Sequence, residues 1–357
     1  MKRVYYIFTP GKLKRKENTV FFIPFQEYNE QEDENLQDEI LLSVDSEVKA
    51  TDMKSKKVIP VNDIDSFHIL TEAAFNTKFL DFCSRNKIPI HYYNYYGYYS
   101  GTFYPKEYLL SGSLLVKQVK TYSSKIKRLK LAQLIVTGAS YNIIRNLKYY
   151  NTRGCNLGTQ IDTIECLITT IHGTTNIEEL MGIEGNIRKV YYTSFSEIMG
   201  NEYEDFSRAY HPPDNPLNAI ISFANSMAYT TVLSEIYRTQ LNPTVSFLHE
   251  PGERRFSLAL DIAEIFKPIF ADRLIFKMIN NKQIQSKDFE SKLNGFYLKP
   301  KARKKFVEEF EKKLATTIKH RKLNRSISYR RLIRLECYKI IKHLIGEKEF
   351  EPFKIWW

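Results

Sequence analysis

The residues best suited to chemistry lie between Val245 and Asp272, in the stretch VSFLHEPGERRFSLALDIAEIFKPIFAD. His249 precedes a short polar turn, and the apolar run after the turn carries Asp261 and Glu264, which are three residues apart. On a helix, this spacing puts both carboxylates on one face. Imidazole binds several transition metals, and carboxylates bind Mg²⁺ and Mn²⁺. The stretch therefore indicates a divalent-metal site.

Each of these residues also has an ordinary structural explanation. A lone histidine such as His249 is more often a hydrogen-bonded structural residue than a ligand, and Asp261 and Glu264 would fit a solvated surface. Their neighbours argue against the surface, because the other residues from Leu258 to Phe266 are all apolar. An unpaired carboxylate in such surroundings is costly, so we expect both acids to be paired or metal-bound.

A second acidic motif lies upstream, in MGIEGNIRKVYY at residues 181–192. Glu184 stands between two glycines, and we expect it at the start of a helix, where another backbone can approach closely. A glutamate near a helix N-terminus is also favourable simply because of the helix dipole. The motif alone does not separate a ligand from a helix-stabilising acid.

The elements that must position these residues change character near residue 105. Before it, Val4–Phe8 and Val20–Pro24 are predicted to form a hairpin across a basic turn. From Lys106 onward the apolar spacing is helical, and strand signals almost disappear. We predict an α+β protein with a small β-rich N-terminal domain, residues 1–105, and a larger all-α catalytic domain, residues 106–357.

Further elements follow from the same patterns. Those predicted are a strand at Ile64–Leu70, helices at Glu72–Arg85, Leu109–Tyr150 with a break at Gly138, Ile161–Ile171, Ile177–Phe195, Ala302–His320 and Tyr329–Leu344, and a buried helix from Pro216 through Tyr237. The tyrosine-rich stretch from Ile88 to Pro105 is predicted to be a hairpin that packs its own sheet or a dimer interface. Stacking of nucleic-acid bases is its alternative function.

The charge distribution indicates a polyanionic partner. The chain of 357 residues has a net charge of +12, and a chain so basic favours nucleic acid as a partner. Between Lys299 and Lys342 there are 16 Lys and Arg against 4 Asp and Glu, so the excess is concentrated there. The alternative for such a run is a solvated helical face.

Other classes of protein are disfavoured. The start MKRVYYIFTPGK turns polar at once, unlike a signal peptide, and no apolar run approaches the roughly 20 residues of a membrane span. We expect a soluble, cytoplasmic protein without a membrane partner. None of the four cysteines forms a CxxC pair, and no GxxxxGK[ST] phosphate loop occurs.

The order and spacing of several motifs resemble one known family. GIEG is followed by NPLNAIISFANSMAY, then by FLHE and SLALDIAEIFKP. Together with KRVYYIF and GYYSGTFYP near the start, and HRKLNRSISYRRLIRLECYKIIKHL and PFKIWW near the end, they resemble the CRISPR-associated adaptation endonuclease/integrase family along nearly the whole chain. GIEG alone would be weak, but the ordered set is specific.

The resemblance implies a catalytic metal site of one acid, one histidine and a further acid, with Mg²⁺ or Mn²⁺ as the cofactor. On this chain these residues are Glu184, then His249, 65 residues on, and Glu264, 15 further. The family pattern also implies roles in orienting the ligands or positioning DNA for five residues: Asp261, which is also an alternative ligand, Tyr229, Lys267, Arg208 and His211.

The function implied by the resemblance is the joining of 3′-hydroxyl ends of short foreign DNA fragments into a CRISPR repeat array by transesterification. The implied partners are DNA, a second copy held through the N-terminal domain, and the small second CRISPR-associated adaptation protein. Two alternatives stay open. One is a metal-dependent nuclease on branched or single-stranded DNA without productive integration, and the other is a DNA-binding scaffold with an unused metal site.

Overall fold

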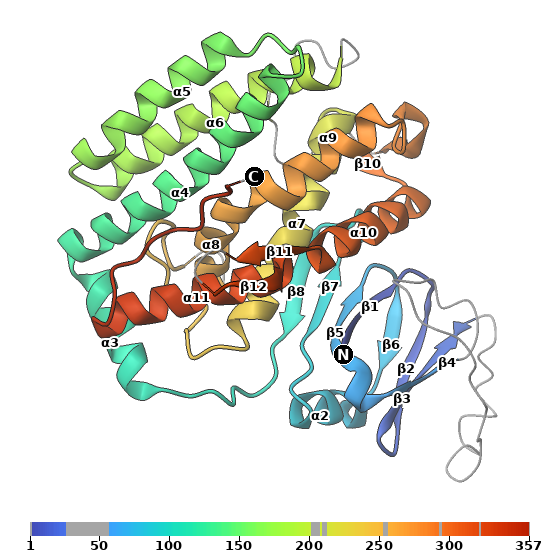
Figure 1. The fold of residues 1–357 in the computed structure, drawn as a ribbon. Coiled ribbons are helices and arrows are strands. Elements are labelled where there is room, and N and C mark those ends of the chain that lie inside the picture. The colour runs from blue at the N-terminus through green and yellow to red at the C-terminus, as the bar shows by residue number, and fades with distance from the viewer. Residues whose placement is uncertain are drawn as a thin grey trace. The chain divides into compact units, whose positions relative to one another are not determined.

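The computed structural model describes residues 2–25, 57–200, 208, 213–252, 256–292, 295–320 and 323–356. The chain divides into two compact units, Met1–Tyr108 with Pro300–Glu308, and Leu109–Lys299 with Glu309–Trp357. The first is β-rich and the second is largely helical (Figure 1). The predicted fold class is thereby confirmed.

In its described residues the N-terminal unit contains two four-stranded sheets, helix α2 and the first part of α10, Pro300–Glu308. The first sheet has the order β1 (Arg3–Ile7), β5 (Ile64–Ile69), β7 (Ile90–Tyr93) and β8 (Tyr99–Phe103), and the second has the order β4 (Lys57–Pro60), β3 (Thr19–Pro24), β2 (Gly11–Lys16) and β6 (Ala73–Phe75). Helix α2 is Thr77–Arg85. Apolar side chains of both sheets and of α2 share one core, in which Leu13, Phe67 and Phe79 are fully buried.

The predicted strands of this unit are present, but the predicted hairpin was wrong. β1 pairs in parallel with β5, and β3 pairs instead with β2, the basic segment predicted to be a turn. In β2 the lysines alternate with inward positions, and Leu13 is fully buried between Lys12 and Lys14. Alternation of this kind is typical of a half-buried strand, and composition alone concealed it.

Two other predictions for this unit have different outcomes. The predicted helix from Glu72 begins only at Thr77, because Asn76 caps it, and Ala73–Phe75 pairs with β2 as a strand. The tyrosine-rich stretch does form the β7–β8 hairpin. Its role in dimerisation or base stacking stays a prediction.

The second unit is built from helices. They are α3 (Gly112–Ser123), α4 (Lys125–Asn151), α5 (Gly158–Thr170), α6 (Ile177–Met199), α7 (Pro216–Ile236), α8 (Ser257–Lys267), α9 (Arg273–Asn280), the last part of α10 (Pro300–Ala315) and α11 (Tyr329–Ile345), with a π-helical turn at Pro268–Asp272 between α8 and α9. Two short antiparallel hairpins that were not predicted accompany them: β9 (Phe289–Lys292) with β10 (Gly295–Leu298), and β11 (Thr317–His320) with β12 (Arg325–Ser328).

Helix α7 is almost entirely buried, as predicted. Asn215 caps it by accepting a hydrogen bond from the Asn218 amide at 2.8 Å, and Pro216 occupies its first position. A proline is favourable there because the first amide of a helix has no intrahelical partner. Helix α8 packs against α7 and α4, and α4, α5 and α6 lie side by side (Figure 1). None of the helices in the described part of the chain is long and apolar enough to cross a membrane.

Gly138 does not break the predicted long helix, which is interrupted instead at Ser124, between α3 and α4. A Cβ atom at Gly138 would lie 2.5 Å from the Cβ atom of Pro352. The glycine therefore lets the segment around Pro352 lie directly on α4. Asn142, one turn further along α4, accepts a hydrogen bond from the Ile355 amide at 2.9 Å.

We predict that Gly138→Ala destabilises the protein by about 1–3 kcal/mol, because overpacking forces the backbone or its neighbours to shift. Gly182→Ala is the matched control, since it is also a helical glycine, and no atom lies within 4 Å of the added Cβ. That control should stabilise by about 0.5–1 kcal/mol, because alanine loses less backbone entropy in a helix. Urea unfolding measures both, and equal effects would contradict the close approach.

Candidate functional site

The predicted site residues come from three segments of the helical unit. Asp261 and Glu264 lie on α8, His249 lies in the loop before it, and Glu184 lies on α6. The expectation that Glu184 begins a helix was wrong, because α6 starts seven residues earlier, after the N-cap Asn176. The glycines around Glu184 lie inside the helix, and its N-cap is Asn176.

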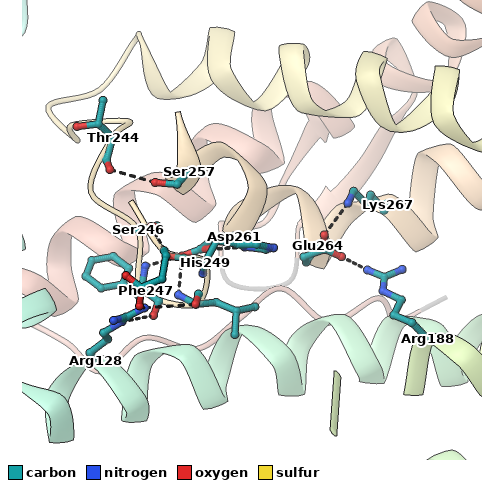
Figure 2. A network of polar contacts seen from close by, with 12 residues as sticks. Arg128, Arg188, Thr244, Ser246, Phe247, His249, Ser257, Asp261, Glu264 and Lys267 are labelled. Carbon is teal, nitrogen blue, oxygen red and sulfur yellow. Dashed lines mark hydrogen bonds and ion pairs between the residues drawn. The ribbon is translucent and has the colours of Figure 1, made fainter. Parts of the chain in front are cut away.

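Asp261 organises the loop that carries His249 (Figure 2). Its Oδ2 accepts the amides of Phe247 at 2.6 Å and Leu248 at 3.0 Å, and its Oδ1 accepts the His249 amide at 3.0 Å and ring Nδ1 at 2.8 Å. The side chain of Asp261 is fully buried. With four donors on two oxygens, its part is to hold the histidine in place. In neutral His249 the proton sits on Nδ1, which leaves Nε2 with its lone pair.

Helices α3 and α4 hold the same loop from outside. Gln118 donates to the carbonyl oxygens of Asn242 at 2.9 Å and Val245 at 2.8 Å. Arg128 donates from Nε to the Phe247 carbonyl at 2.8 Å and pairs with Glu250 at 2.7 Å. These side chains tie the loop to α3 and α4 through its backbone carbonyls and Glu250.

A second group of charges surrounds Glu264 (Figure 2). The guanidinium of Arg188 pairs with Glu264, and its Nε donates to Glu184 at 3.0 Å. Lys267 contacts the other oxygen of Glu264 at 2.5 Å. Glu184 and Glu264 thus meet at one cation. Arg188 follows Glu184 by four residues, a spacing that places both side chains on one face of α6, and this signal was available in the sequence but was missed.

The charges shift the pKa values of this group in consistent directions. Burial raises the pKa of Glu264, but Arg188, Lys267 and His249 outweigh burial and lower it to about 2. Burial lowers the pKa of Arg188, while Glu264 and Glu184 raise it well above its usual value. Both side chains are therefore ionised at neutral pH, and each depends on the other for compensation.

His249 is shifted by the same neighbours. Burial lowers its pKa, but the hydrogen bond and charge of Asp261 and the charge of Glu264 raise it above the usual 6.5. Because the pKa of His249 is higher in the folded protein than the usual 6.5, protonation of His249 stabilises the folded state. This contribution is complete below pH 6.5 and is lost as the pH rises through the raised pKa. The imidazole thus becomes a neutral lone-pair donor only at a higher pH than an exposed histidine.

Asp272 is a further buried acid beside this group, and the sequence patterns did not single it out. It ends the π-helical turn after α8, and its side chain is almost fully buried. Burial raises its pKa to about 6, although Arg188 and Tyr191 act to lower it. Arg188 therefore pairs with two carboxylates of the predicted site, and the charge of Asp272 also raises its pKa. π-Helical turns are frequent at functional sites.

The other predicted residues lie on or beside α7 and on α8, apart from His211. Tyr229 is buried on α7, the helix that packs against α8. Arg208 lies against the start of α7, where it donates to Asn218 at 2.8 Å and Ser222 at 3.0 Å. Lys267 joins the Glu264 group, as given above. His211 lies outside the described residues.

The donor set suits a hard divalent ion, but the carboxylates are held by cations. Within the described parts of the chain, no three His, Cys, Asp or Glu side chains are grouped so that they would hold a metal. Arg188 and Lys267 each contact one oxygen of Glu264. Two carboxylates and one imidazole nitrogen are nevertheless ligands that Mg²⁺ and Mn²⁺ accept. The chemistry of the donor set thus fits such an ion, which would have to displace these cations, and the role of the three residues as ligands stays a prediction.

Comparison with known proteins identifies the family. The profile described as CRISPR associated protein Cas1 matches residues 5–312. A relative from Fusobacterium nucleatum, named CRISPR-associated endonuclease Cas1, is 47% identical over 100% of this chain and 98% of its own length. A solved Cas1 protein from Thermotoga maritima is 37% identical, with a TM-score of 0.83 over 98% of this chain and 99% of that one.

A more distant chain has the same fold. It belongs to a Cas6-RT-Cas1–Cas2 complex, is 14% identical, and matches 100% of this chain and 36% of its own length with a TM-score of 0.81. The match over most of the chain and the 47% identity leave no other assignment. This protein belongs to the Cas1 family of CRISPR-associated proteins.

We predict that Asp261→Asn lowers the pKa of His249 and destabilises the protein by about 2–4 kcal/mol. The amide nitrogen of asparagine would face backbone amides, which leaves buried donors unpaired. The NMR titration of the His249 ring protons gives the pKa, and urea unfolding gives the stability. Asp162→Asn, on the exposed face of α5, is the control and should change neither. An unchanged pKa in Asp261→Asn would contradict the role given to Asp261.

Proposed function

We propose that this protein is a metal-dependent DNA endonuclease and integrase of CRISPR adaptation. It joins the 3′-hydroxyl ends of short foreign DNA fragments into the repeat array. Membership of the Cas1 family and the endonuclease name of its relative support this proposal. One observation carries it. Arg188 brings Glu184 and Glu264 together, and the charge of Glu264 also acts on His249, whose pKa it raises.

Glu184, His249 and Glu264 are the proposed ligands of Mg²⁺ or Mn²⁺. A bound ion would supply Lewis-acid stabilisation of the charge that develops on a phosphodiester under attack. Asp261 keeps the Nε2 lone pair of His249 available, because it holds the proton on Nδ1. Lys267, displaced from Glu264, would be free to contact a non-bridging phosphate oxygen.

The proposed reaction exchanges one phosphodiester for another. The oxygen of a 3′-hydroxyl loses its proton and forms a bond to phosphorus, the bond from phosphorus to the leaving 3′-oxygen breaks, and that oxygen takes up a proton, so the protons balance. When water attacks instead, the same site hydrolyses DNA. The exchange conserves the number of phosphodiester bonds, so it requires no nucleotide triphosphate, in agreement with the absence of a phosphate-loop motif from the sequence.

The proposed partners follow the family. The distant structural neighbour is part of a complex with Cas2, and we propose that this chain also acts with a small Cas2-type partner. We further propose a homodimer through residues 1–105, catalysis by residues 106–357, and action in the cytoplasm, where the DNA is.

A strand-transfer assay tests the proposed function. A labelled short duplex with free 3′-hydroxyls is mixed with the protein, its small partner, Mn²⁺ or Mg²⁺ and a plasmid that carries a repeat array. We expect wild type to join label to the plasmid, and His249→Ala to reduce joining by at least about 100-fold, the scale on which loss of one catalytic group acts. The control His172→Ala, an exposed histidine, should join label normally.

Each other result of this assay has a definite meaning. Cleavage without joining would replace integration by a nuclease function on branched or single-stranded DNA. Joining that persists in His249→Ala would remove the proposed site while leaving the DNA function in place. DNA binding with neither cleavage nor joining would favour the scaffold.

A metal-binding measurement tests the role of Arg188 separately. We predict that Arg188→Gln binds Mn²⁺ about tenfold more tightly than wild type, because an adjacent opposite charge changes the affinity of a carboxylate for a proton by one to three powers of ten. Isothermal titration calorimetry without DNA measures this affinity. Arg188→Lys retains the charge and should bind like wild type. Weaker binding by Arg188→Gln would mean that the arginine organises the ligands rather than competing with the ion.

A further inference from the structure

A basic pocket lies in the helical unit, away from the carboxylates of the proposed site. It has a volume of about 280 Å³ and is formed between α9 and the last turns of α10. Its lining residues are Arg273, Leu274, Lys277, Glu309, Lys312, Lys313 and Thr316. Four cations and one carboxylate thus surround a single small volume, and a divalent ion would be repelled from it.

The one carboxylate is already used. Glu309 pairs with Lys277 at 2.9 Å and with Lys312 at 2.7 Å. Two lysines share its single negative charge, so this part of the pocket keeps a positive excess. The remaining two cations, Arg273 and Lys313, form no ion pair with a carboxylate of the described residues.

Arg273 and Lys313 are held by uncharged groups. The Nε of Arg273 donates to the side-chain oxygen of Asn146 at 2.5 Å, and its guanidinium lies 5.5 Å from the centre of the Tyr149 ring. The ammonium of Lys313 lies 4.9 Å from the centre of the Tyr329 ring. Such contacts orient a cation without neutralising it. Burial lowers the pKa of Lys313, and the charges of Arg273 and Lys277 lower it further.

The helix dipoles explain only part of this arrangement. Lys312 and Lys313 are in the last turn of α10, and Lys277 is in the last turn of α9, where a cation is favourable. Arg273 directly follows the π-helical turn Pro268–Asp272 and lies inside the continuous helical run from Ser257 to Asn280, so no helix end compensates its charge. An anion in the pocket would compensate the charges of Arg273, Lys277 and Lys313 together.

We propose that this pocket binds a phosphate group. Arginine and lysine donors form strong charge-assisted hydrogen bonds to phosphate oxygens, and four such side chains line this pocket. Arg153 adds a further positive charge nearby, because its guanidinium lies 4.1 Å from the centre of the Tyr149 ring. The site is a second phosphate contact, distinct from the one at Lys267. That the phosphate belongs to a DNA backbone rests on the proposed function, whereas the anion site itself does not.

The pocket is rigidly connected to the proposed catalytic site. Arg273 directly follows Asp272, the buried acid beside Arg188. Asn146, which holds Arg273, also donates to the Pro268 carbonyl at 2.6 Å and to the Tyr191 hydroxyl at 3.1 Å. A backbone phosphate bound here would be fixed relative to α8, so the pocket would set the direction of the DNA strand at Glu264.

Binding of a labelled short duplex in EDTA tests the pocket without involving a metal or a reaction. We expect Lys313→Gln to lower the affinity about tenfold, the loss typical of one charge-assisted hydrogen bond, and to reduce the slope of log affinity against log salt by about 1. Lys313→Arg should retain the wild-type affinity. Lys117→Gln, which removes one exposed charge from α3, should leave the affinity and the slope unchanged.

Inorganic phosphate distinguishes the two sources of the anion. Calorimetry with phosphate should show binding to wild type that Lys313→Gln loses. If phosphate binding is lost while duplex affinity is unchanged, the anion site stands but the DNA assignment falls. If Lys313→Gln changes neither phosphate binding nor duplex affinity, or if Lys117→Gln lowers the duplex affinity as much as Lys313→Gln does, the pocket is no phosphate site. Duplex binding through Lys313 without strand transfer would refute only the proposed function.

Discussion

The hydrogen bonds of one buried carboxylate determine the geometry of the proposed site. Asp261 receives three consecutive backbone amides and the ring of His249, so the loop before α8 is attached to the helix through a single side chain. Glu264 is almost one turn further along the same helix. The histidine and this glutamate therefore move together, and only Glu184, on α6, comes from an independent element. A rigid displacement of α8 would shift two of the three proposed ligands together.

The second constraint is charge balance in a buried place. Glu184, Glu264, Arg188 and Lys267 compensate one another inside the helical unit. Breaking such a group by removing one partner costs far more than the group itself contributes. The free protein is thus stable with its acids already paired, and an incoming cation has to exchange with a guanidinium. Asp272 is a further buried acid, with a pKa raised to about 6 by burial, and its charge also acts on that guanidinium.

Much of this organisation was predictable from the sequence, and the failures have physical causes. The spacing of apolar residues predicts the α+β class and helix α7 from Pro216. The cost of burying an unpaired carboxylate predicts that the acids on α8 have partners. The β2–β3 pairing was missed because a strand rich in lysine has the composition of a turn. The start of α6 was misplaced because its cap is Asn176, not the glycine near Glu184. Ion pairs between different elements leave no local pattern in the sequence. Arg188 and Glu264, for example, are 76 residues apart.

The segment around Pro352 gives the helical unit a property of a different kind, namely the order of its assembly during synthesis. Asn142 of α4 donates to the Phe353 carbonyl and accepts from the Ile355 amide, while Glu336 of α11 accepts from the Phe353 amide. The Phe353 ring stacks on Phe266 of α8 at 5.6 Å. The surface between α4 and α8 therefore stays uncovered until these residues have left the ribosome. The helix that carries Asp261 and Glu264 therefore completes its packing only after residue 355 has left the ribosome.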